Sequence, residues 1–414
     1  MEIKLPEGAR YILKKLYSSG YKGYIVGGCV RDSLLGKVPA DFDIASNAQP
    51  CDVMDMFKDF KLLSTGLKHG TVTVIIDNMP FEVTTFRKEG AYSDYRRPDH
   101  VEFIGTIDED LSRRDFTINS MAYNPREGLV DLYGGYEDLC NGIIRCVGDA
   151  DARFKEDALR MMRAIRFSAQ LGFEIDKYTF DSIVANAALI KKISCERIKD
   201  ELCKMLLSDN AGKLSLLFKA GLMDNIIPEL SDHVKLYRSE GHLIKCIDES
   251  DKDLVVRLTI MFYEIASLAA GILKRLKFQN SIIDNVDKTL HFRGIKLKED
   301  RVSIKRELKE TGEECFIHLL AVREALVRAD NEHEKLIKID NIKEIVQDIL
   351  NKNECFNRKM LCIGGNDIKK IGVNDGRTIG LMIDALINKV IENPELNKKD
   401  ILIKYAEEIK KTDF

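Results

Sequence analysis

The sequence lacks the features that mark several classes of protein. Its 10 cysteines include no Cys-x-x-Cys pair, and the two nearest in sequence, Cys140 and Cys146, are too far apart for a usual zinc knuckle. The first residues carry no apolar signal region, and no later apolar run is long enough to cross a bilayer. A P-loop, a Gly-x-Ser-x-Gly motif and an internal repeat are also missing. We therefore expect reduced, mostly buried cysteines and a cytoplasmic protein.

An excess of charge of either sign is missing as well. The 64 basic and 67 acidic residues leave a net charge of −3 at pH 7, which argues against a protein that coats nucleic acid by bulk attraction. A local basic surface remains compatible with this balance. With 414 residues the chain exceeds one ordinary hydrophobic core, so we expect two or more domains.

The clearest local pattern lies in residues 24–46. The apolar residues 24–26 predict a buried strand, and Gly27 and Gly28 end it and let the backbone come close to an anion. Residues 29–35 predict a short helix, and residues 42–44 predict a second strand. We expect the rest of the chain to be built around this strand, glycine turn, helix and second strand.

Two aspartates flank Phe42 in this second strand. Side chains alternate faces along a strand, so Asp41 and Asp43 are expected to project from one face while Phe42 enters the core. Paired carboxylates on a rigid edge suit Mg²⁺, which shares its other positions with water and substrate phosphates. The alternative is an exposed Asp-x-Asp at a strand end. The Gly-Gly turn and Arg31 just upstream favour the metal site.

A third carboxylate is predicted on a neighbouring hairpin. Residues 71–76 predict a strand, residues 77–80 a turn, and residues 81–87 the partner strand. Glu82 then lies on the face opposite to its apolar neighbours, next to the aspartates if these strands share a sheet. It is either the third acid of the site or an exposed glutamate on a solvated strand, and the pattern leaves both open.

A basic segment follows at residues 111–119. Arg114 offers a planar fork of donors to phosphates, and Asp115 and Asn119 offer partners for ribose hydroxyls. A solvated charge cluster is the alternative. Between this segment and the hairpin, residues 87–98 are polar and contain glycine, which predicts a loop that gates substrates.

From Asp149 onward the periodicity becomes helical and stays so, which predicts an all-α remainder. Residues 153–167 predict one helix with an apolar arc and, at steps of three on the opposite side, a polar series. That series consists of Asp157, Arg160, Arg163 and Arg166. A salt-bridged solvated face would be balanced in charge, whereas here three arginines follow one aspartate, so we predict the wall of a binding groove.

Six motifs in this order resemble the class II tRNA nucleotidyltransferase and bacterial poly(A) polymerase family. They are Gly27-Gly28-x-Val30-Arg31-Asp32, Asp41-x-Asp43, Lys68-His69-Gly70-Thr71, Glu82-Val83-Thr84-Thr85-Phe86-Arg87, Arg113-Arg114-Asp115-Phe116-Thr117-x-Asn119 and Glu156-Asp157-x-x-Arg160-x-x-Arg163-x-x-Arg166-Phe167. A looser likeness extends over residues 194–202 and 364–380. The resemblance implies an α+β, seahorse-like enzyme. Its parts would be a mixed-sheet catalytic head (1–148), a helical neck (149–210), a helical body (211–330) and a helical tail that binds tRNA (331–414).

The resemblance also implies the activity and the site. It implies Mg²⁺-dependent, template-independent addition of C, C and A to the 3′ end of tRNA from CTP and ATP, without a membrane or DNA partner. The implied metal ligands are Asp41 and Asp43, with Glu82 as a further catalytic acid. The nucleotide-binding residues are Gly28, Arg31, Arg114, Asp115, Asn119, Asp157, Arg160, Arg163 and Arg166. The alternatives are an A-adding enzyme or poly(A) polymerase of the same family, and a non-catalytic RNA-binding protein with a decayed head.

Three finer expectations complete this reading. We expect Asp157 and Arg160 to choose the base, because cytosine and adenine both present an amino donor beside a ring-nitrogen acceptor. We expect the loop of residues 87–98 to govern the change from C to A addition. Some relatives carry a His-Asp phosphohydrolase site, and since Tyr263 and Glu264 stand where that pair is expected, we predict no such activity.

Overall fold

The fold is described from a computed structural model that covers residues 3–67, 70–89, 101–103 and 105–413. Contacts between Cα atoms divide the chain into two compact units, Met1–Arg238 and Ser239–Phe414, which are treated separately below. In the parts of the chain just named, no helix is both long and apolar enough to span a membrane.

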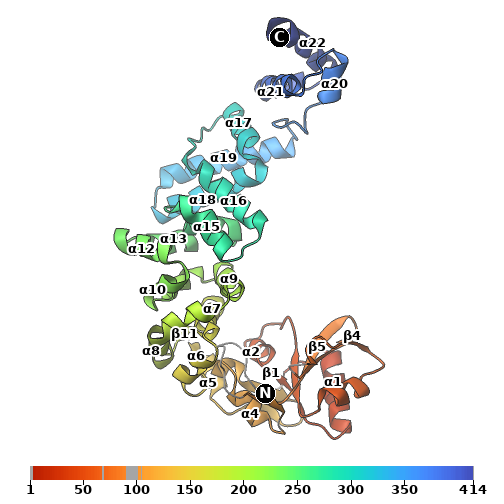
Figure 1. The fold of residues 1–414 in the computed structure, drawn as a ribbon, viewed down its shortest axis with the longest axis vertical. Helices are drawn as coiled ribbons and strands as arrows, with labels where there is room; N and C mark the ends of the chain where they lie inside the picture. Colours follow the sequence, from red (N-terminus) through yellow and green to blue (C-terminus); the bar gives the residue numbers. More distant parts are fainter. Residues whose placement is uncertain (1–2, 68–69, 90–100, 104, 414) are drawn as a thin grey trace. The chain divides into compact units, whose positions relative to one another are not determined.

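A mixed sheet forms the centre of the first unit (Figure 1), with strand order β3-β4-β5-β2-β1-β8-β9. Its strands are β1 (Gly23–Val26), β2 (Asp43–Ser46), β3 (Lys61–Leu63), β4 (Thr71–Ile76), β5 (Met79–Thr85), β8 (Met121–Asn124) and β9 (Gly128–Asp131). β2 and β5 run parallel, whereas β1 is antiparallel to both β2 and β8. The sheet therefore brings the predicted aspartate strand and the predicted glutamate strand side by side.

Helices cover both faces of this sheet, which explains why all four residues of β1 are buried. On one face Tyr24 and Val26 share an apolar cluster with Ile107 and Leu111 of α4 (Ile107–Ser112). On the other face α1 (Glu7–Ser18) packs so closely that a Cβ on Gly23 would lie 2.8 Å from a methyl carbon of a leucine in α1. Strands buried on both faces make a rigid platform for side chains at their ends.

The hairpin β4–β5 fixes the position of Glu82. Asp77 and Asn78 have φ angles of 51° and 62°. A two-residue hairpin turn requires positive values at both residues, because its twist then matches the twist of the two strands. Met79 and Pro80 therefore belong to β5, and the turn has two residues where the sequence predicted four. In the parallel pair, Glu82 lies opposite Asp43. The condition on which Glu82 would lie beside the aspartates, that these strands share a sheet, is met.

Helices and short strands make up the rest of the first unit. The helices are α2 (Gly28–Leu34), α3 (Pro50–Met56), α5 (Gly135–Asn141), α6 (Ala150–Glu156), α7 (Leu159–Leu171), α8 (Lys177–Asn186), α9 (Cys195–Leu206), α10 (Ser215–Lys219), α11 (Met223–Ile226) and α12 (Pro228–Tyr237). The strands are β6 (Arg87–Glu89), β7 (Val101–Phe103), β10 (Ile143–Ile144) and β11 (Glu174–Ile175).

The remainder after Asp149 is not purely helical, as the sequence had led us to expect. β11 lies within it and pairs in parallel with β10, which precedes it in the predicted head. The two strands are too short to leave a periodic signal in the sequence. They tie the segment that contains α6 and α7 to the sheet-bearing part of the same unit.

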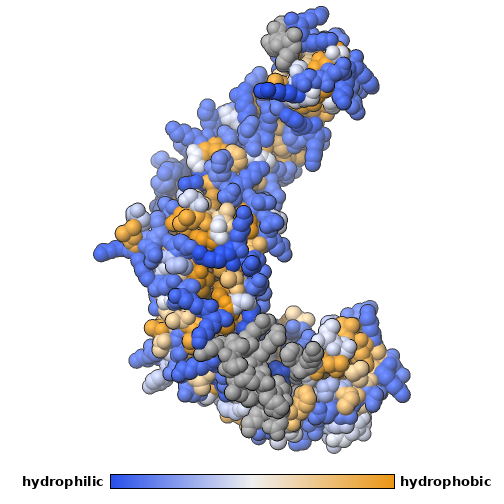
Figure 2. Space-filling view, in the orientation of Figure 1, coloured by the Kyte–Doolittle hydropathy of each residue, from blue (hydrophilic) through white to orange (hydrophobic). Residues whose placement is uncertain are grey.

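The second unit is built from helices in the part that the structure describes. They are α13 (Glu240–Asp248), α14 (Leu254–Met261), α15 (Ala266–Arg275), α16 (Asn280–His291), α17 (Arg301–Thr311), α18 (Glu313–Ala329), α19 (His333–Asn351), α20 (Gly365–Lys370), α21 (Gly376–Glu392) and α22 (Lys399–Asp413). One apolar cluster joins α17, α18 and α19, and another joins α20, α21 and α22. Figure 2 shows that most of the outward-facing surface is hydrophilic, with smaller apolar areas between.

The predicted fold class, a mixed sheet followed by helices, is confirmed. The finer division at residues 148, 210 and 330 stays a prediction, because the contacts mark one boundary only, after Arg238.

Candidate active site

The turn from β1 to α2 requires glycine at position 27. Gly27 has φ 78° and ψ −133°, a conformation that residues with a Cβ rarely adopt. A Cβ there would also lie 2.8 Å from Nη1 of Arg114. The turn thus lets the backbone and the predicted phosphate-binding side chains approach each other closely. Gly28, the other predicted glycine, begins α2.

Three carboxylates lie beside this turn. Asp41, Asp43 and Glu82 are exposed, whereas Phe42 and Ile44 between and after the aspartates are buried, as the alternation predicted. β2 begins only at Asp43, so Asp41 lies just before the strand and not within it. Dehydration by surrounding atoms and the charges of Asp41 and Glu82 raise the pKa of Asp43 to about 6, against the opposing charge of Arg114.

The donor set of this edge fits a hard divalent cation. A cation stabilises neighbouring carboxylates that repel one another, and oxygen ligands are those that Mg²⁺ prefers. Among the described residues, no three His, Cys, Asp or Glu side chains form a preassembled metal cluster. The roles of Asp41 and Asp43 as metal ligands, and of Glu82 as a third acid, stay predictions.

Arg31, Arg114 and Asn119 form one connected group next to the glycine turn. Arg31 donates from Nη1 to the side-chain oxygen of Asn119 at 2.7 Å, and Arg114 Nη1 lies 3.4 Å from the Asn119 carbonyl oxygen. Arg114 and Arg113 both pair with the buried carboxylate of Asp110. Although burial alone would raise the pKa of Asp110, the two arginines lower it below its ordinary value.

Asp115 holds Arg163, the second arginine of the series on α7. Its Oδ2 accepts from Nε of Arg163 at 2.7 Å, and its Oδ1 accepts from the backbone of Phe116 and from Asn119. Burial opposes ionisation of Asp115, but the charge and hydrogen bond of Arg163 hold its pKa at about 2. The predicted nucleotide-binding residues of residues 111–119 and of α7 are thus brought together.

The prediction of one continuous helix through residues 153–167 is wrong. Asp157 has an extended backbone and separates α6 from α7. Its side chain accepts from the Leu159 amide at 3.1 Å, and its carbonyl accepts from the Arg160 amide at 3.0 Å. Asp157 therefore caps the start of α7, a role that competes with continuing the helix.

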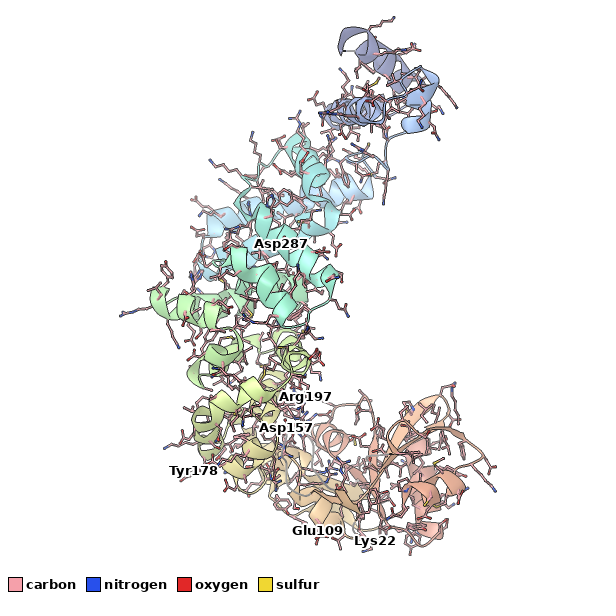
Figure 3. All side chains as sticks on the ribbon, in the orientation of Figure 1. Lys22, Glu109, Asp157, Tyr178, Arg197 and Asp287 are labelled. Carbon is pink, nitrogen blue, oxygen red and sulfur yellow. The ribbon has the colours of Figure 1, made fainter. Side chains whose placement is uncertain are left out.

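Arg197 of α9 holds the Asp157 carboxylate. Its two Nη atoms lie 2.7 and 3.2 Å from the two carboxylate oxygens, a bidentate pair (Figure 3 labels both residues). The sequence analysis missed Arg197, although it lies in the stretch of residues 194–202 that carries part of the family likeness. The signal was weak because the two partners are 40 residues apart.

Arg160 is held by Glu156. Its Nη1 donates to Glu156 at 2.6 Å, and its Nη2 donates to the Arg113 carbonyl oxygen at 3.3 Å. Arg153 pairs with the same Glu156 carboxylate at 2.8 Å. Arg160 is 8 % exposed and Arg166 7 %, while Asp157 and Arg163 are half-buried, so the series is not a fully solvated helix face. Glu156 was quoted as part of a motif, but its role as a holder of arginines was not foreseen.

Two predicted features lie outside the described residues. Lys68 and His69 of the third motif belong to them, and so do residues 90–100, which include most of the predicted gating loop. The hypothesis that this loop governs the change from C to A addition stays a prediction.

Models of known families match the chain in three successive segments. The poly A polymerase head domain matches residues 23–145, which include the glycine turn and the carboxylate edge. The probable RNA and SrmB-binding site of polymerase A matches residues 172–233, and the putative tRNA nucleotidyltransferase domain 2 matches residues 249–406. The class that this fold and site define is a nucleotidyltransferase.

Curated relatives match over nearly the whole chain. The CCA-adding enzyme of Ligilactobacillus salivarius is 35 % identical over 406 residues, covering 96 % of this chain and 95 % of that enzyme. The CCA-adding enzyme of Leuconostoc mesenteroides is 36 % identical over 409 residues, covering 97 % and 96 %. A crystal structure of the Bacillus stearothermophilus CCA-adding enzyme in complex with CTP aligns with a TM-score of 0.79 at 31 % identity, covering 98 % and 97 %. The chain belongs to the tRNA nucleotidyltransferase and poly(A) polymerase family.

Proposed function

We propose that this enzyme adds C, C and A to the 3′ end of tRNA from CTP and ATP without a nucleic-acid template. The observation that carries the proposal is the full-length match to CCA-adding enzymes, combined with an intact pair, Asp41 and Asp43, beside the glycine turn. Shared head motifs alone would fit a poly(A) polymerase equally well. The match over the helical segments as well as the head favours tRNA.

The two aspartates would hold a divalent cation, and we propose Mg²⁺. Such a cation would supply positive charge that stabilises the phosphates and would increase the acidity of the RNA 3′-hydroxyl. Asp41 and Asp43 orient it from a strand end that is rigid because β2 lies between β1 and β5. Glu82 lies in register with Asp43 and adds negative charge to the same edge.

The arginines serve the leaving pyrophosphate. Charge spreads over phosphate oxygens in the transition state of phosphoryl transfer, and preorganised donors stabilise it. Arg31 and Arg114 are held next to the glycine turn by Asn119, and Arg163 is held by Asp115. Because these side chains are fixed before substrate arrives, little ordering remains to be done when the triphosphate binds.

Base choice is assigned to Asp157 and Arg160, as the sequence suggested, with Arg197 as an added support. A carboxylate has about four sites that accept hydrogen bonds, so Asp157 can stay paired with Arg197 and still accept the amino group of cytosine or adenine. A guanidinium has five donors, more than the contacts of Arg160 described above use. Uracil and guanine present a carbonyl where the amino group is needed.

The test offers the enzyme tRNA that ends at the discriminator base, with CTP alone, ATP alone and both together, and sequences the products. We expect CC from CTP alone and CCA from the mixture. Addition of A only to tRNA that already ends in CC would identify an A-adding enzyme, and long A tracts would identify a poly(A) polymerase. No addition under any condition would identify a non-catalytic RNA-binding protein. The cytoplasmic location and the tRNA-binding tail of residues 331–414 stay predictions.

A further inference from the structure

Three arginines surround the ring of Phe167 near the C-terminal end of α7. The guanidinium carbon of Arg166 lies 4.0 Å from the ring centroid, that of Arg31 5.3 Å and that of Arg163 5.4 Å. All three lie within the distance at which a ring face attracts a cation. Phe167 is 6 % exposed, and attraction between a cation and a ring is strongest where water is excluded.

The ring joins two separate elements of the first unit. Arg31 belongs to α2, directly after the glycine turn, whereas Arg163 and Arg166 belong to α7. Phe116, which follows Asp115, packs edge-on against the ring, with centroids 5.7 Å apart and an interplanar angle of 80°. A second aromatic ring thus also contacts Phe167.

Arg166 lies closest to the ring, and its ion pair is the least regular of the three. Arg31 pairs with Asp32 at 2.8 Å, and Arg163 donates to Asp115. The Nε of Arg166 lies 3.0 Å from Oε2 of Glu201, yet in the described part of the chain neither buried atom has a partner that meets hydrogen-bond geometry. Burial and the nearby charges of Arg163 and Arg31 lower the pKa of Arg166 to about 10, against the attraction of Glu201.

A cation held over a ring keeps its hydrogen-bond donors. The N–H bonds of a guanidinium lie in its plane, and the attraction to the ring face uses none of them. A carboxylate in place of the ring would occupy two donors and neutralise the charge. An aromatic support is therefore suited to arginines that must bind an anion.

We propose that Phe167 is a positioning residue for the incoming nucleotide. Its ring holds Arg31, Arg163 and Arg166 together against their mutual repulsion, with donors directed to the triphosphate. This inference rests on the proposed function for one point only, which is the identity of the nucleotide that binds. The competing explanation is that Phe167 fills the apolar core like any buried phenylalanine.

Fluorinated phenylalanines at position 167 separate the two explanations. One, two or three ring fluorines withdraw electron density from the ring face stepwise while the size of the side chain changes little. The dissociation constant of CTP, measured by calorimetry on the full chain, should rise with each fluorine, by about three- to tenfold in total. The same fluorine series at Phe154, another buried phenylalanine, in α6, should leave the dissociation constant of CTP unchanged, because the three arginines lie over Phe167 instead.

Two further measurements make the result decisive. The Hε proton of Arg166 should show a ring-current shift that Phe167→Leu abolishes and Phe167→Tyr retains, which reports the contact without any substrate. A CTP affinity that stays flat across the fluorine series, with unchanged melting temperature, would overturn the proposal, and so would a wild-type chain that binds no CTP. If only the proposed function fails, the dissociation constant of CTP would still rise with each fluorine, but tRNA would gain no nucleotide.

Discussion

Two clusters of buried or half-buried charge, one in each unit, contain the same kinds of residue but differ in arrangement. In the second unit Arg301 pairs with Asp348 at 2.7 Å and with Glu354, and Lys305, only 1 % exposed, lies 3.2 Å from Glu354. Two cations thus meet two carboxylates. In the first unit three guanidinium groups gather over one ring, and each also lies beside one carboxylate, that of Asp32, Asp115 or Glu201.

The difference separates a structural cluster from a binding site. A buried ion cluster is tolerated when each charge has partners, because the attraction then offsets the loss of hydration. The arginines around Phe167 have carboxylate partners too, but they also crowd one another, since, in addition to burial, Arg163 and Arg31 lower the pKa of Arg166, and such crowding is typical of a site that binds an anion. Residue type alone does not reveal this, since arginine and carboxylate occur in both clusters. The predictions below change one cluster at a time.

The largest effect is expected at the carboxylate edge of the first unit. Asp41→Ala or Asp43→Ala should reduce nucleotide addition by at least about 10³-fold, because the metal that activates the hydroxyl loses a ligand. Binding of tRNA, measured by gel shift, should persist, since the helical segments are untouched. Activity within tenfold of wild type in both variants would refute the metal assignment.

The next effect concerns base choice. The double variant Asp157→Ala with Arg160→Ala should lower the preference for C and A over U and G by about 10²-fold, since each unpaired buried polar group costs about 1–3 kcal/mol. Single-nucleotide incorporation with each of the four triphosphates measures this. Arg197→Ala is the matched variant, because it removes the support of Asp157 and leaves the carboxylate. A double variant that remains active and still selects C and A would place base choice elsewhere.

The cluster in the second unit predicts the opposite outcome, an effect on stability without one on binding. Glu354→Ala leaves Arg301 and the buried Lys305 without their shared partner, so the second unit should lose about 3 kcal/mol of stability in urea unfolding. The dissociation constant of CTP should not change. Asp348→Ala, at the more exposed end of the same cluster, should cost clearly less stability than Glu354→Ala. Equal costs for the two variants would contradict this account.

The smallest effect is a pH dependence of the first unit. Because the folded pKa of Asp115 is about 2 and the ordinary value is 3.8, its pairing with Arg163 stabilises fully above about pH 5 and is lost as pH falls toward 2. The loss amounts to about 2 kcal/mol. Asp115→Asn should lack this part of the acid sensitivity when unfolding is followed from pH 5 to 2. An identical pH dependence in variant and wild type would show that the pair does not form.

Local patterns were enough for the parts of the site that are local. The spacing of Asp41 and Asp43 placed both on one face, and the turn at Asp77 and Asn78 placed Glu82 on the neighbouring strand. These inferences succeed because strand alternation and turn chemistry act over a few residues.

Features that depend on distant partners were not predicted. Asp157 breaks the helix because it caps α7 and is held by Arg197, and helical periodicity in the sequence continues through that break. The gathering of arginines over Phe167 likewise needs α2 and α7 to be packed together. Apolar residues in a helical pattern suggest core, and nothing in spacing distinguishes a ring that fills space from one that supports cations.

The short parallel pair β10–β11 limits how the catalytic part of this chain can be exchanged with that of a relative. A chimera joined at residue 148, where the sequence suggested a boundary, would take β10 from one parent and β11 from the other. It would also separate Arg145 from Asp176, which are 2.8 Å apart. A junction after Arg238 keeps these pairs, α7 and Arg197 from a single parent. To keep the site intact, a chimera should therefore take all of the first 238 residues from one parent, and not the sheet alone.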